Sequence, residues 1–500
     1  MAVPRRTPWL LAIGLTSIWL VYPIVSGPLA LLRDFWSWFV LCIVGLLCLR
    51  QRNPLNHLLP ALAWGLAMAA LANAGQSLLQ AYQLWRNTAH TDVYGFLHQR
   101  NQLATLCLLG LAALGWIHAV RPTSLASKRL WANGIAAMSG LLGAVISLSA
   151  SRTGLLGMVL LWLAMEALVL RYRSSSAPAA MQLTLRMAVL GYVLALVPML
   201  GTDAPSLGIL ARQNAQEGAN VCSSRLSLWA NVLELIAIKP WWGWGWGELD
   251  YAHFVTLFQS ERFCALLSNA HNLPLQLAVE LGIPVALAAC SAALWCLFRG
   301  TPWREQHPDR LLGWGLLLPI VLHSMLEYPW WYGPFQVTAA LAMWILWRSP
   351  HRDDHHSSTH SVPLGRYRNA ASWMLAAGLA LVIFAAADYV RASQIYLQPS
   401  ERLPGFRHNT QQQIRKSVFF QDQIDFADLG LTAVDAENAA TVHALALKML
   451  QFSPEAMVGE KLLASTHLLG LKDEYEYYQV RLTIAFPDLF TQRQTKPAGY

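Results

Sequence analysis

The sequence predicts an all-α membrane protein that crosses the bilayer about eleven times and carries a long outer loop and a C-terminal helical domain. Hydrophobic residues make up 55% of the 500 positions and charged residues only 13%, whereas soluble globular chains carry roughly 25% charge. The charges are gathered in short clusters, and the apolar runs between them are long enough to cross a bilayer, about 20 residues each.

The apolar runs follow one another along the first 390 residues. The first begins near Trp9, after Arg5 and Arg6, and no small-residue cleavage site precedes the next run. We therefore interpret it as an anchor rather than a cleaved signal peptide. The expected spans are residues 9–26, 34–49, 58–75, 103–120, 130–150, 154–170, 185–201, 272–298, 311–326, 335–347 and 370–390.

The distribution of Lys and Arg predicts the orientation of these spans. If the N-terminus is cytoplasmic, most basic residues fall in inner loops, and the short outer loops carry only Arg33, Arg86, Arg100 and Arg152. Cytoplasmic loops are enriched in Lys and Arg, so this asymmetry favours an inner N-terminus and, with an odd number of spans, an outer C-terminus. Because the basic residues occupy short loops, we expect no nucleic-acid partner despite the net charge of +8.

Two long segments fall on the outer side, a loop over residues 202–271 and a tail over residues 391–500. The tail is richer in polar and charged residues, and its apolar residues recur at helical spacing, as in Val442, Leu445 and Leu450. We therefore expect two domains: a membrane domain over residues 1–390, which includes the loop, and a soluble helical domain over residues 391–500.

The cysteines divide in the same way. Cys222 and Cys264 lie in the outer loop, and the other five lie in expected spans. Two cysteines alone in an oxidising compartment predict a disulfide that closes the loop.

Polar residues near the outer membrane face are costly and point to function. Five clusters of them lie on this side, and they come from loops and span ends far apart in the sequence. These clusters are His98–Gln102, Ser151–Thr153, Ser224–Arg225 with Trp229, Asn269–Asn272, and His323-Ser324 with Glu327–Pro329.

The clusters combine Arg100, Arg152 and Arg225 with His271 and His323. The guanidinium group binds phosphate oxygens in a bidentate way and keeps its charge, and imidazole can accept a proton from a hydroxyl group. This pattern predicts a phosphate-bearing leaving group and a hydroxyl nucleophile. No Asp-x-Asp pair accompanies the clusters, so we expect the cations to stabilise the leaving group without a metal ion.

Other interpretations of these residues stay open. Arg100 and Arg152 could extend to lipid headgroups, His323 could be a hydrogen-bonded packing residue, and Glu327 could orient a neighbour. The tryptophans of residues 241–247 could stack on sugars or form an interfacial aromatic belt. The His-rich inner loop 349–368 is typical of a solvated linker, because no Cys or acidic spacing supports a metal site.

The order of these motifs resembles the O-antigen ligase and polymerase superfamily, and is most similar to its branch of bacterial O-oligosaccharyltransferases that glycosylate pilins. The ligase signature is His-Asn, nine residues, and Gly, which here corresponds to His271, Asn272 and Gly282; Val285 departs from the Gly, Thr or Tyr usual at that position. The other matching motifs are Gln99-Arg100-Asn101, Ser151-Arg152, Arg225 with Trp229, Pro240 with Gly243 and Gly245, and Glu327-Tyr328-Pro329.

The resemblance implies O-linked protein glycosylation by a glycosyltransferase of the bacterial inner membrane. The donor would be an oligosaccharide on undecaprenyl pyrophosphate, and the acceptor a Ser or Thr hydroxyl of a periplasmic protein, typically a type IV pilin. No cofactor or metal is implied, and the tail would be the periplasmic domain of this branch.

The resemblance also assigns roles. His271 would be the base or the group that orients the acceptor, Gln99 and Tyr328 would be positioning donors, and Arg100, Arg152 and Arg225 would bind the pyrophosphate. Asn272, His323, Glu327 and Trp229 are supporting candidates.

Rival functions are an O-antigen polymerase or a lipopolysaccharide O-antigen ligase, which use the same donor, and a membrane transporter. The soluble tail favours protein glycosylation over the polymerase. Against a transporter, the chain has no internal repeat and no matching pair of Gly/Pro-broken helices.

Overall fold

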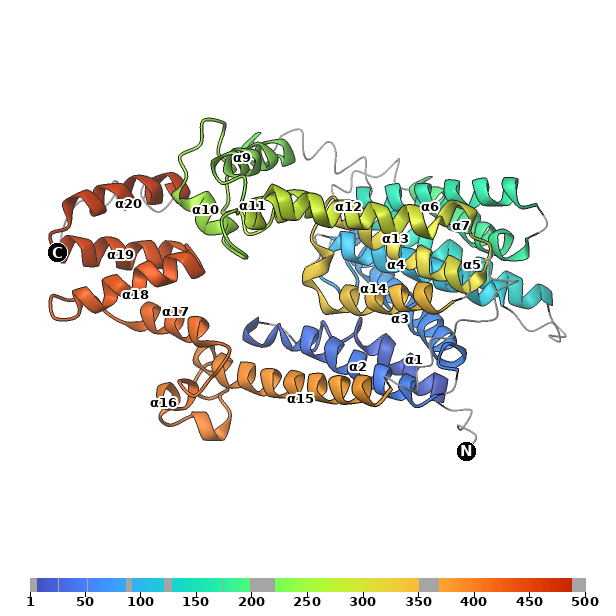
Figure 1. Ribbon diagram of the computed structural model, residues 1–500, viewed down its shortest axis with the longest axis horizontal. Helices are drawn as coiled ribbons and strands as arrows, with labels where there is room; N and C mark the ends of the chain where they lie inside the picture. The colour runs from blue at the N-terminus through green and yellow to red at the C-terminus, as the bar shows by residue number, and fades with distance from the viewer. Residues whose placement is uncertain are drawn as a thin grey trace. The chain divides into compact units, whose positions relative to one another are not determined.

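A computed structural model describes residues 7–25, 27–51, 53–86, 92–120, 128–173, 175–197, 221–349 and 368–487. All regular elements in these ranges are helices (Figure 1). The predicted all-α fold is confirmed.

Eight helices within the described ranges are long and apolar enough to cross a membrane, so the chain is a multi-pass membrane protein. The helices at three further expected spans are shorter: α1 (Thr7–Ser17), α13 (Pro308–Ser324) and α14 (Gly333–Arg348). The eight are α2 (Leu32–Leu49), α3 (Leu55–Trp85), α4 (Arg100–Ala119), α5 (Lys128–Leu148), α6 (Arg152–Arg171), α7 (Ser176–Leu196), α12 (Ile283–Gly300) and α15 (Arg368–Ser393).

The segment expected as one span over residues 272–298 is two helices, α11 (Leu273–Leu281) and α12. The break lies at Gly282, whose φ of 89° is a conformation that side chains with a Cβ rarely adopt. A Cβ on Gly282 would also lie 2.2 Å from the carbonyl oxygen of Trp241. The candidate membrane span therefore begins at Ile283, and α11 precedes it.

The chain divides into two compact units. Unit 1 comprises Met1–Gly218 and Cys296–Phe384, and unit 2 comprises Ala219–Trp295 and Ala385–Tyr500. The described part of the outer loop, residues 221–271, and the tail thus fall in the same unit.

Small residues allow close helix packing in unit 1. Helices α5 and α7 lie too close together for a Cβ atom at two glycines. A Cβ on Gly143 of α5 would lie 1.8 Å from the carbonyl oxygen of Ala188 of α7. A Cβ on Gly191 of α7 would lie 1.9 Å from the carbonyl oxygen of Gly140 of α5. Such contacts between small residues are a main source of helix association in membranes. This packing supports α4, which is buried along nearly its whole length.

In unit 2 the tail packs on the outer loop. Phe254 of α10 (Leu249–Val255) is buried among apolar side chains of the tail helices, and Arg481 donates to the carbonyl oxygen of Val255 at 2.8 Å. Figure 1 shows α10 beside α20. The tail helices are α16 (Thr410–Ile414), α17 (Gln421–Leu431), α18 (Ala439–Phe452), α19 (Ala456–Leu468) and α20 (Lys472–Ala485).

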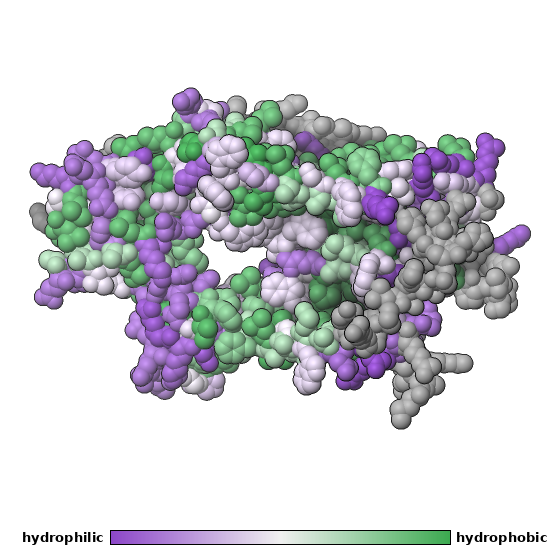
Figure 2. All heavy atoms as spheres, viewed as in Figure 1, coloured by the Kyte–Doolittle hydropathy of each residue, from purple (hydrophilic) through white to green (hydrophobic). Residues whose placement is uncertain are grey.

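The surfaces of α15 and of the tail differ in polarity. Hydrophobic side chains cover α15, whereas hydrophilic side chains gather around α16 and α17 (Figure 2). This contrast is what a membrane helix followed by a water-exposed domain requires.

Candidate active site

Each of the three candidate arginines is the first residue of a helix and follows a capping residue. Arg100 begins α4, Arg152 begins α6, and Arg225 begins α9 (Arg225–Ile238). In each case the preceding side chain accepts a hydrogen bond from a backbone N–H of the first turn: Gln99 from Gln102 at 2.6 Å, Ser151 from Gly154 at 3.0 Å, and Ser224 from Ser227 at 3.1 Å.

This placement concentrates positive charge at the helix starts. A helix N-terminus carries a partial positive charge and unsatisfied N–H groups, which favour a bound anion. A guanidinium group on the first helical residue adds a full charge at the same end. The arrangement is therefore suited to phosphate oxygens.

A hydrogen-bonded bridge joins three segments of unit 1 at one end of the helices. Asn101 accepts from the Ser151 hydroxyl at 2.7 Å and donates to the Glu327 carboxylate at 3.2 Å. It thus connects the starts of α4 and α6 with the segment that follows α13. The sequence placed Asn101 in the right cluster, and the structure adds this bridging role.

Arg100 and Arg152 differ in their surroundings. Arg100 forms an ion pair with Asp92, so part of its charge is already balanced. Arg152 is exposed. Asp92 was not singled out from the sequence, because nothing in its local pattern relates it to a residue eight positions later.

His323 is packed inside unit 1. Its side chain is buried, its Nδ1 lies 3.0 Å from the Thr105 hydroxyl, and its ring meets Phe335 edge-on at 5.7 Å. These contacts fit the packing interpretation better than a role as proton acceptor for a substrate. Tyr328, by contrast, is half-buried and stacks on Tyr332 with ring centres 5.8 Å apart.

In unit 2, His271 occupies a constrained turn before α11. Its φ is 51°, and its backbone N–H donates to the Asn269 side chain at 2.7 Å. A positive φ is uncommon outside glycine and favours a functional interpretation of the position. Asn272 then caps α11 by accepting from the Leu275 N–H at 3.1 Å.

Two hydrogen bonds hold Ala270, directly before His271. The Trp229 indole donates to the Ala270 carbonyl oxygen at 3.1 Å, and the Ala270 N–H donates to the Gln276 side chain at 2.6 Å. The supporting role expected for Trp229 thus has a physical basis. Gln276 was not singled out from the sequence. A polar residue in an otherwise apolar run next to the membrane could have identified it as a candidate.

Gln276 lies one helical turn before Glu280 in α11. Both side chains are almost fully buried, and Oε2 of Glu280 has no hydrogen-bond partner among the described residues. The hydrogen bond between Gln276 and Ala270 therefore joins the buried face of α11 to the turn of His271.

The predicted disulfide between Cys222 and Cys264 is present, with Cα atoms 5.2 Å apart. The Cys264 N–H also donates to the Cys222 carbonyl oxygen at 3.2 Å. The bond joins the residues before Arg225 to the segment that leads to His271. It therefore limits how far these two candidates can separate.

His253 is a second histidine of the loop, but it belongs to the scaffold. Arg262 donates to its Nδ1 at 3.1 Å, so its Nε2 carries the proton and lies 3.3 Å from the Asn231 side-chain oxygen. Burial and, second, the nearby Arg262 charge lower the pKa of His253 to about 3. A histidine so reluctant to take a proton is a poor general base near neutral pH.

The structure distributes the candidates over the two units. Unit 1 carries Gln99, Arg100, Arg152, His323, Glu327 and Tyr328. Unit 2 carries Cys222, Arg225, Trp229, Cys264, His271 and Asn272. Each unit thus holds one group of candidates, with arginine in both and His271 in unit 2.

Three family models match consecutive parts of the chain. A protein glycosylation ligase model matches residues 93–118, which include Gln99 and Arg100. An O-antigen ligase model matches residues 136–290, which include Arg152, Arg225 and His271. The C-terminal model of a virulence factor membrane-bound polymerase matches residues 311–498.

Two curated proteins of Acinetobacter baylyi are similar to this chain. A general O-oligosaccharyltransferase is 23% identical over 312 residues, which cover 59% of this chain and 49% of that protein. A ComP-specific O-oligosaccharyltransferase is 27% identical over 115 residues, 23% of this chain and 21% of that protein. The chain therefore spans at most about half the length of these relatives. No solved structure matches it.

These matches confirm the resemblance to the O-antigen ligase superfamily and to its O-oligosaccharyltransferase branch.

Proposed function

We propose that this protein is an O-oligosaccharyltransferase. It transfers a glycan en bloc from undecaprenyl pyrophosphate to a Ser or Thr hydroxyl of a periplasmic protein. The observation that carries the proposal is His271, held at a positive φ at the start of α11 by contacts on both sides.

In the proposed reaction the acceptor oxygen attacks the anomeric carbon of the glycan. The bond from that carbon to the pyrophosphate oxygen breaks, and its electron pair leaves with the pyrophosphate. His271 accepts the hydroxyl proton as the new glycosidic bond forms. The products are the glycosylated protein and the lipid pyrophosphate.

Arg100, Arg152 and Arg225 stabilise the negative charge on the leaving pyrophosphate. Gln99 and Tyr328 position the donor. Among the described residues, no group of three or more His, Cys, Asp or Glu side chains is placed to hold a metal ion. Metal independence remains a prediction that activity in the presence of a chelator would test.

The proposal places the protein in the bacterial inner membrane with a cytoplasmic N-terminus. The support is the Lys/Arg asymmetry of the loops. A reporter active only in the periplasm should be active when fused after Tyr500 and silent when inserted near His355. The reverse pattern would contradict the orientation.

The acceptor is proposed to be a pilin-like protein, by analogy with the branch that the motifs resemble. The test is the mass of candidate pilins from cells with and without the gene. A shift of the size of a glycan, lost when the gene is absent, is the expected result. Unchanged masses for all secreted Ser/Thr-rich acceptors would contradict protein glycosylation.

A polymerase is the second candidate function, because the model that matches residues 311–498 is described as that of a membrane-bound polymerase. It would use the same donor with a lipid-linked glycan as acceptor. Longer lipid-linked glycans in cells that carry the gene, with unmodified proteins, would favour this alternative.

A further inference from the structure

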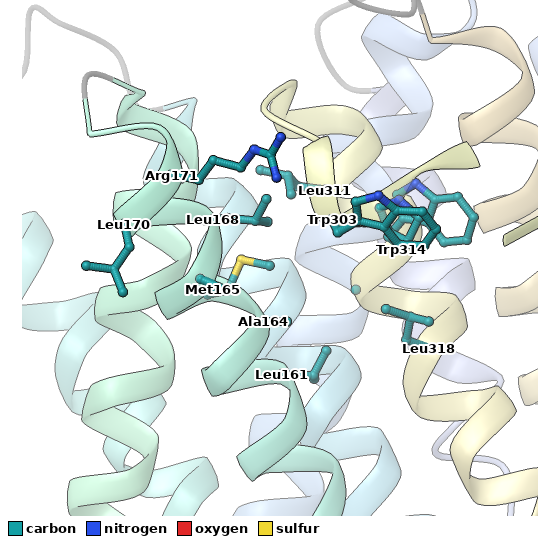
Figure 3. A pocket seen from close by; sticks show the side chains of 13 residues that line it. Leu161, Ala164, Met165, Leu168, Leu170, Arg171, Trp303, Leu311, Trp314 and Leu318 are labelled. Carbon is teal, nitrogen blue, oxygen red and sulfur yellow. The ribbon is translucent and has the colours of Figure 1, made fainter. Parts of the chain in front are cut away.

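Unit 1 contains an apolar pocket far from the candidate residues. Its volume is about 680 Å³, within the range of small-molecule sites, roughly 300–1,000 Å³. One wall is the last half of α6, with Leu161, Met165 and Leu168, and the other carries Trp303 and Trp314 (Figure 3).

The pocket lies at the opposite end of α6 from Arg152. α6 has 20 residues, which as a helix measure roughly 30 Å, about the thickness of the hydrocarbon core. Arg152 begins this helix and Arg171 ends it. The pocket is therefore separate from the candidate active site, near the other membrane face.

The wall that carries Trp303 is held in place by a buried ion pair. Arg310 donates to Glu305 at 2.6 Å, with both side chains almost fully buried. Glu305 also accepts from the N–H groups of Gln306 and His307 at 3.0 Å each, and Arg310 donates to the Leu346 carbonyl oxygen at 2.7 Å. The pocket is thus preformed rather than dependent on a mobile loop.

The positively charged side chain of Arg171 lies at one end of this apolar pocket. Figure 3 shows Arg171 extending from the end of α6 beside the apolar side chains. Within the described part of the chain, no carboxylate lies within ion-pair distance of Arg171, and its guanidinium carbon lies 5.6 Å from the centre of the Tyr172 ring. Nearby carboxylates are already paired: Glu166 with Arg186 and Glu305 with Arg310.

We propose that this pocket binds an anionic phospholipid, with an acyl chain between α6 and α13 and the phosphate on Arg171. The chemistry fits a lipid because the walls are apolar, the helix carries exposed leucines on its lipid side, and the cation lies at headgroup depth. Under the predicted topology this is the cytoplasmic leaflet. The proposal does not depend on glycosyl transfer.

The test uses the full chain, purified and delipidated in detergent, then titrated with phosphatidylglycerol or with phosphatidylethanolamine of the same acyl chains. Native mass spectrometry counts the bound lipid and gives its Kd. We expect one tightly bound phosphatidylglycerol. Arg171→Gln should weaken the binding of phosphatidylglycerol about fivefold, equivalent to the roughly 1 kcal/mol that one Lys or Arg contributes near an anionic membrane surface. The Kd for phosphatidylethanolamine should stay unchanged.

A matched pair of variants tests the pocket itself. Ala164 lines the pocket and is exposed, so Ala164→Trp should fill the pocket and abolish the tight binding of phosphatidylglycerol. The neighbouring Leu163 is 52% exposed and outside the pocket lining, so Leu163→Trp should bind as the parent does. Ala164→Leu is the smaller substitute if Ala164→Trp does not insert.

Three outcomes would overturn the proposal. The first is equal binding by the Ala164 and Leu163 variants. The second is an unchanged preference for phosphatidylglycerol in Arg171→Gln. The third is displacement of the bound lipid by undecaprenyl phosphate at equal concentration, which would assign the pocket to an isoprenoid lipid instead.

Discussion

The two units hold their candidate residues by different means. In unit 1 they lie at the ends of packed membrane helices, and a side-chain bridge through Asn101 connects those ends. In unit 2 the support comes from the Cys222–Cys264 disulfide and from buried amide side chains that bind loop backbone, such as Gln276 at Ala270.

This difference suggests that the two units have different roles in the proposed reaction. A bundle of membrane helices is suited to holding a lipid-linked donor, because its geometry changes little. A loop fixed by local contacts is suited to presenting a proton acceptor to acceptors of varied shape. We therefore expect substitutions in unit 1 to affect mainly donor binding, and those around His271 to affect mainly turnover.

The largest expected effect belongs to His271→Ala. It should lower turnover by roughly 10²–10⁴-fold, the usual contribution of general acid–base catalysis, and leave donor binding intact. The measurement is glycan transfer to a purified acceptor, followed by mass spectrometry, with donor binding assayed separately.

His467→Ala in the tail is the matched control for loss of an imidazole, and it should transfer at the parental rate. Near-parental turnover of His271→Ala would contradict the base assignment.

Loss of the disulfide should be the next largest effect. The bond closes a loop with a sequence separation of 42 residues, and such closure stabilises a fold by about 3–4 kcal/mol. Replacing both Cys222 and Cys264 by Ser should therefore lower the unfolding temperature of unit 2. Thermal unfolding with and without reductant measures this unfolding temperature. Equal unfolding temperatures for parent and variant would contradict the stabilisation expected from the disulfide.

Substitution of an arginine should have an intermediate effect. Arg152→Ala should weaken donor binding by roughly 10–100-fold, the loss of charge-assisted hydrogen bonds, and Arg152→Lys should restore little because it lacks the planar fork. Titration with the lipid-linked donor measures the affinity of both variants, and a parental affinity in Arg152→Ala would contradict the assignment.

Much of the fold could be predicted from the sequence. Apolar runs near the length of a bilayer identify membrane helices without any knowledge of their partners. The break at Gly282 was less visible, because its neighbours are as apolar as the helices on either side; only the backbone at φ 89° shows that the chain turns there. The packing of Phe254 into the tail joins residues about 200 positions apart, and no local pattern contains that relation.

The candidate site could be predicted by residue type but not by partner. His271 and the arginines stand out because charge is costly near a membrane. Their partners do not stand out. Asp92 resembles any surface carboxylate in the sequence. Gln276 accepts from the backbone N–H of Ala270, a group that nearly every residue has, so no residue pattern marks this contact.

The smallest expected effect, at Gln276, tests the positioning of His271 most directly. Gln276→Leu keeps the approximate volume of the side chain but leaves the Ala270 N–H without its acceptor. We expect kcat per folded molecule to fall about tenfold, near the lower end of the roughly 1–3 kcal/mol cost of an unsatisfied buried donor, with KM for the donor unchanged. Combining Gln276→Glu with Glu280→Gln keeps an oxygen acceptor for the Ala270 N–H without adding a second carboxylate to this part of α11. This pair should recover most of kcat. A purely structural role would instead lower the folded fraction in Gln276→Leu and leave kcat of the folded protein at the parental value, which steady-state kinetics on the size-selected monodisperse fraction would reveal.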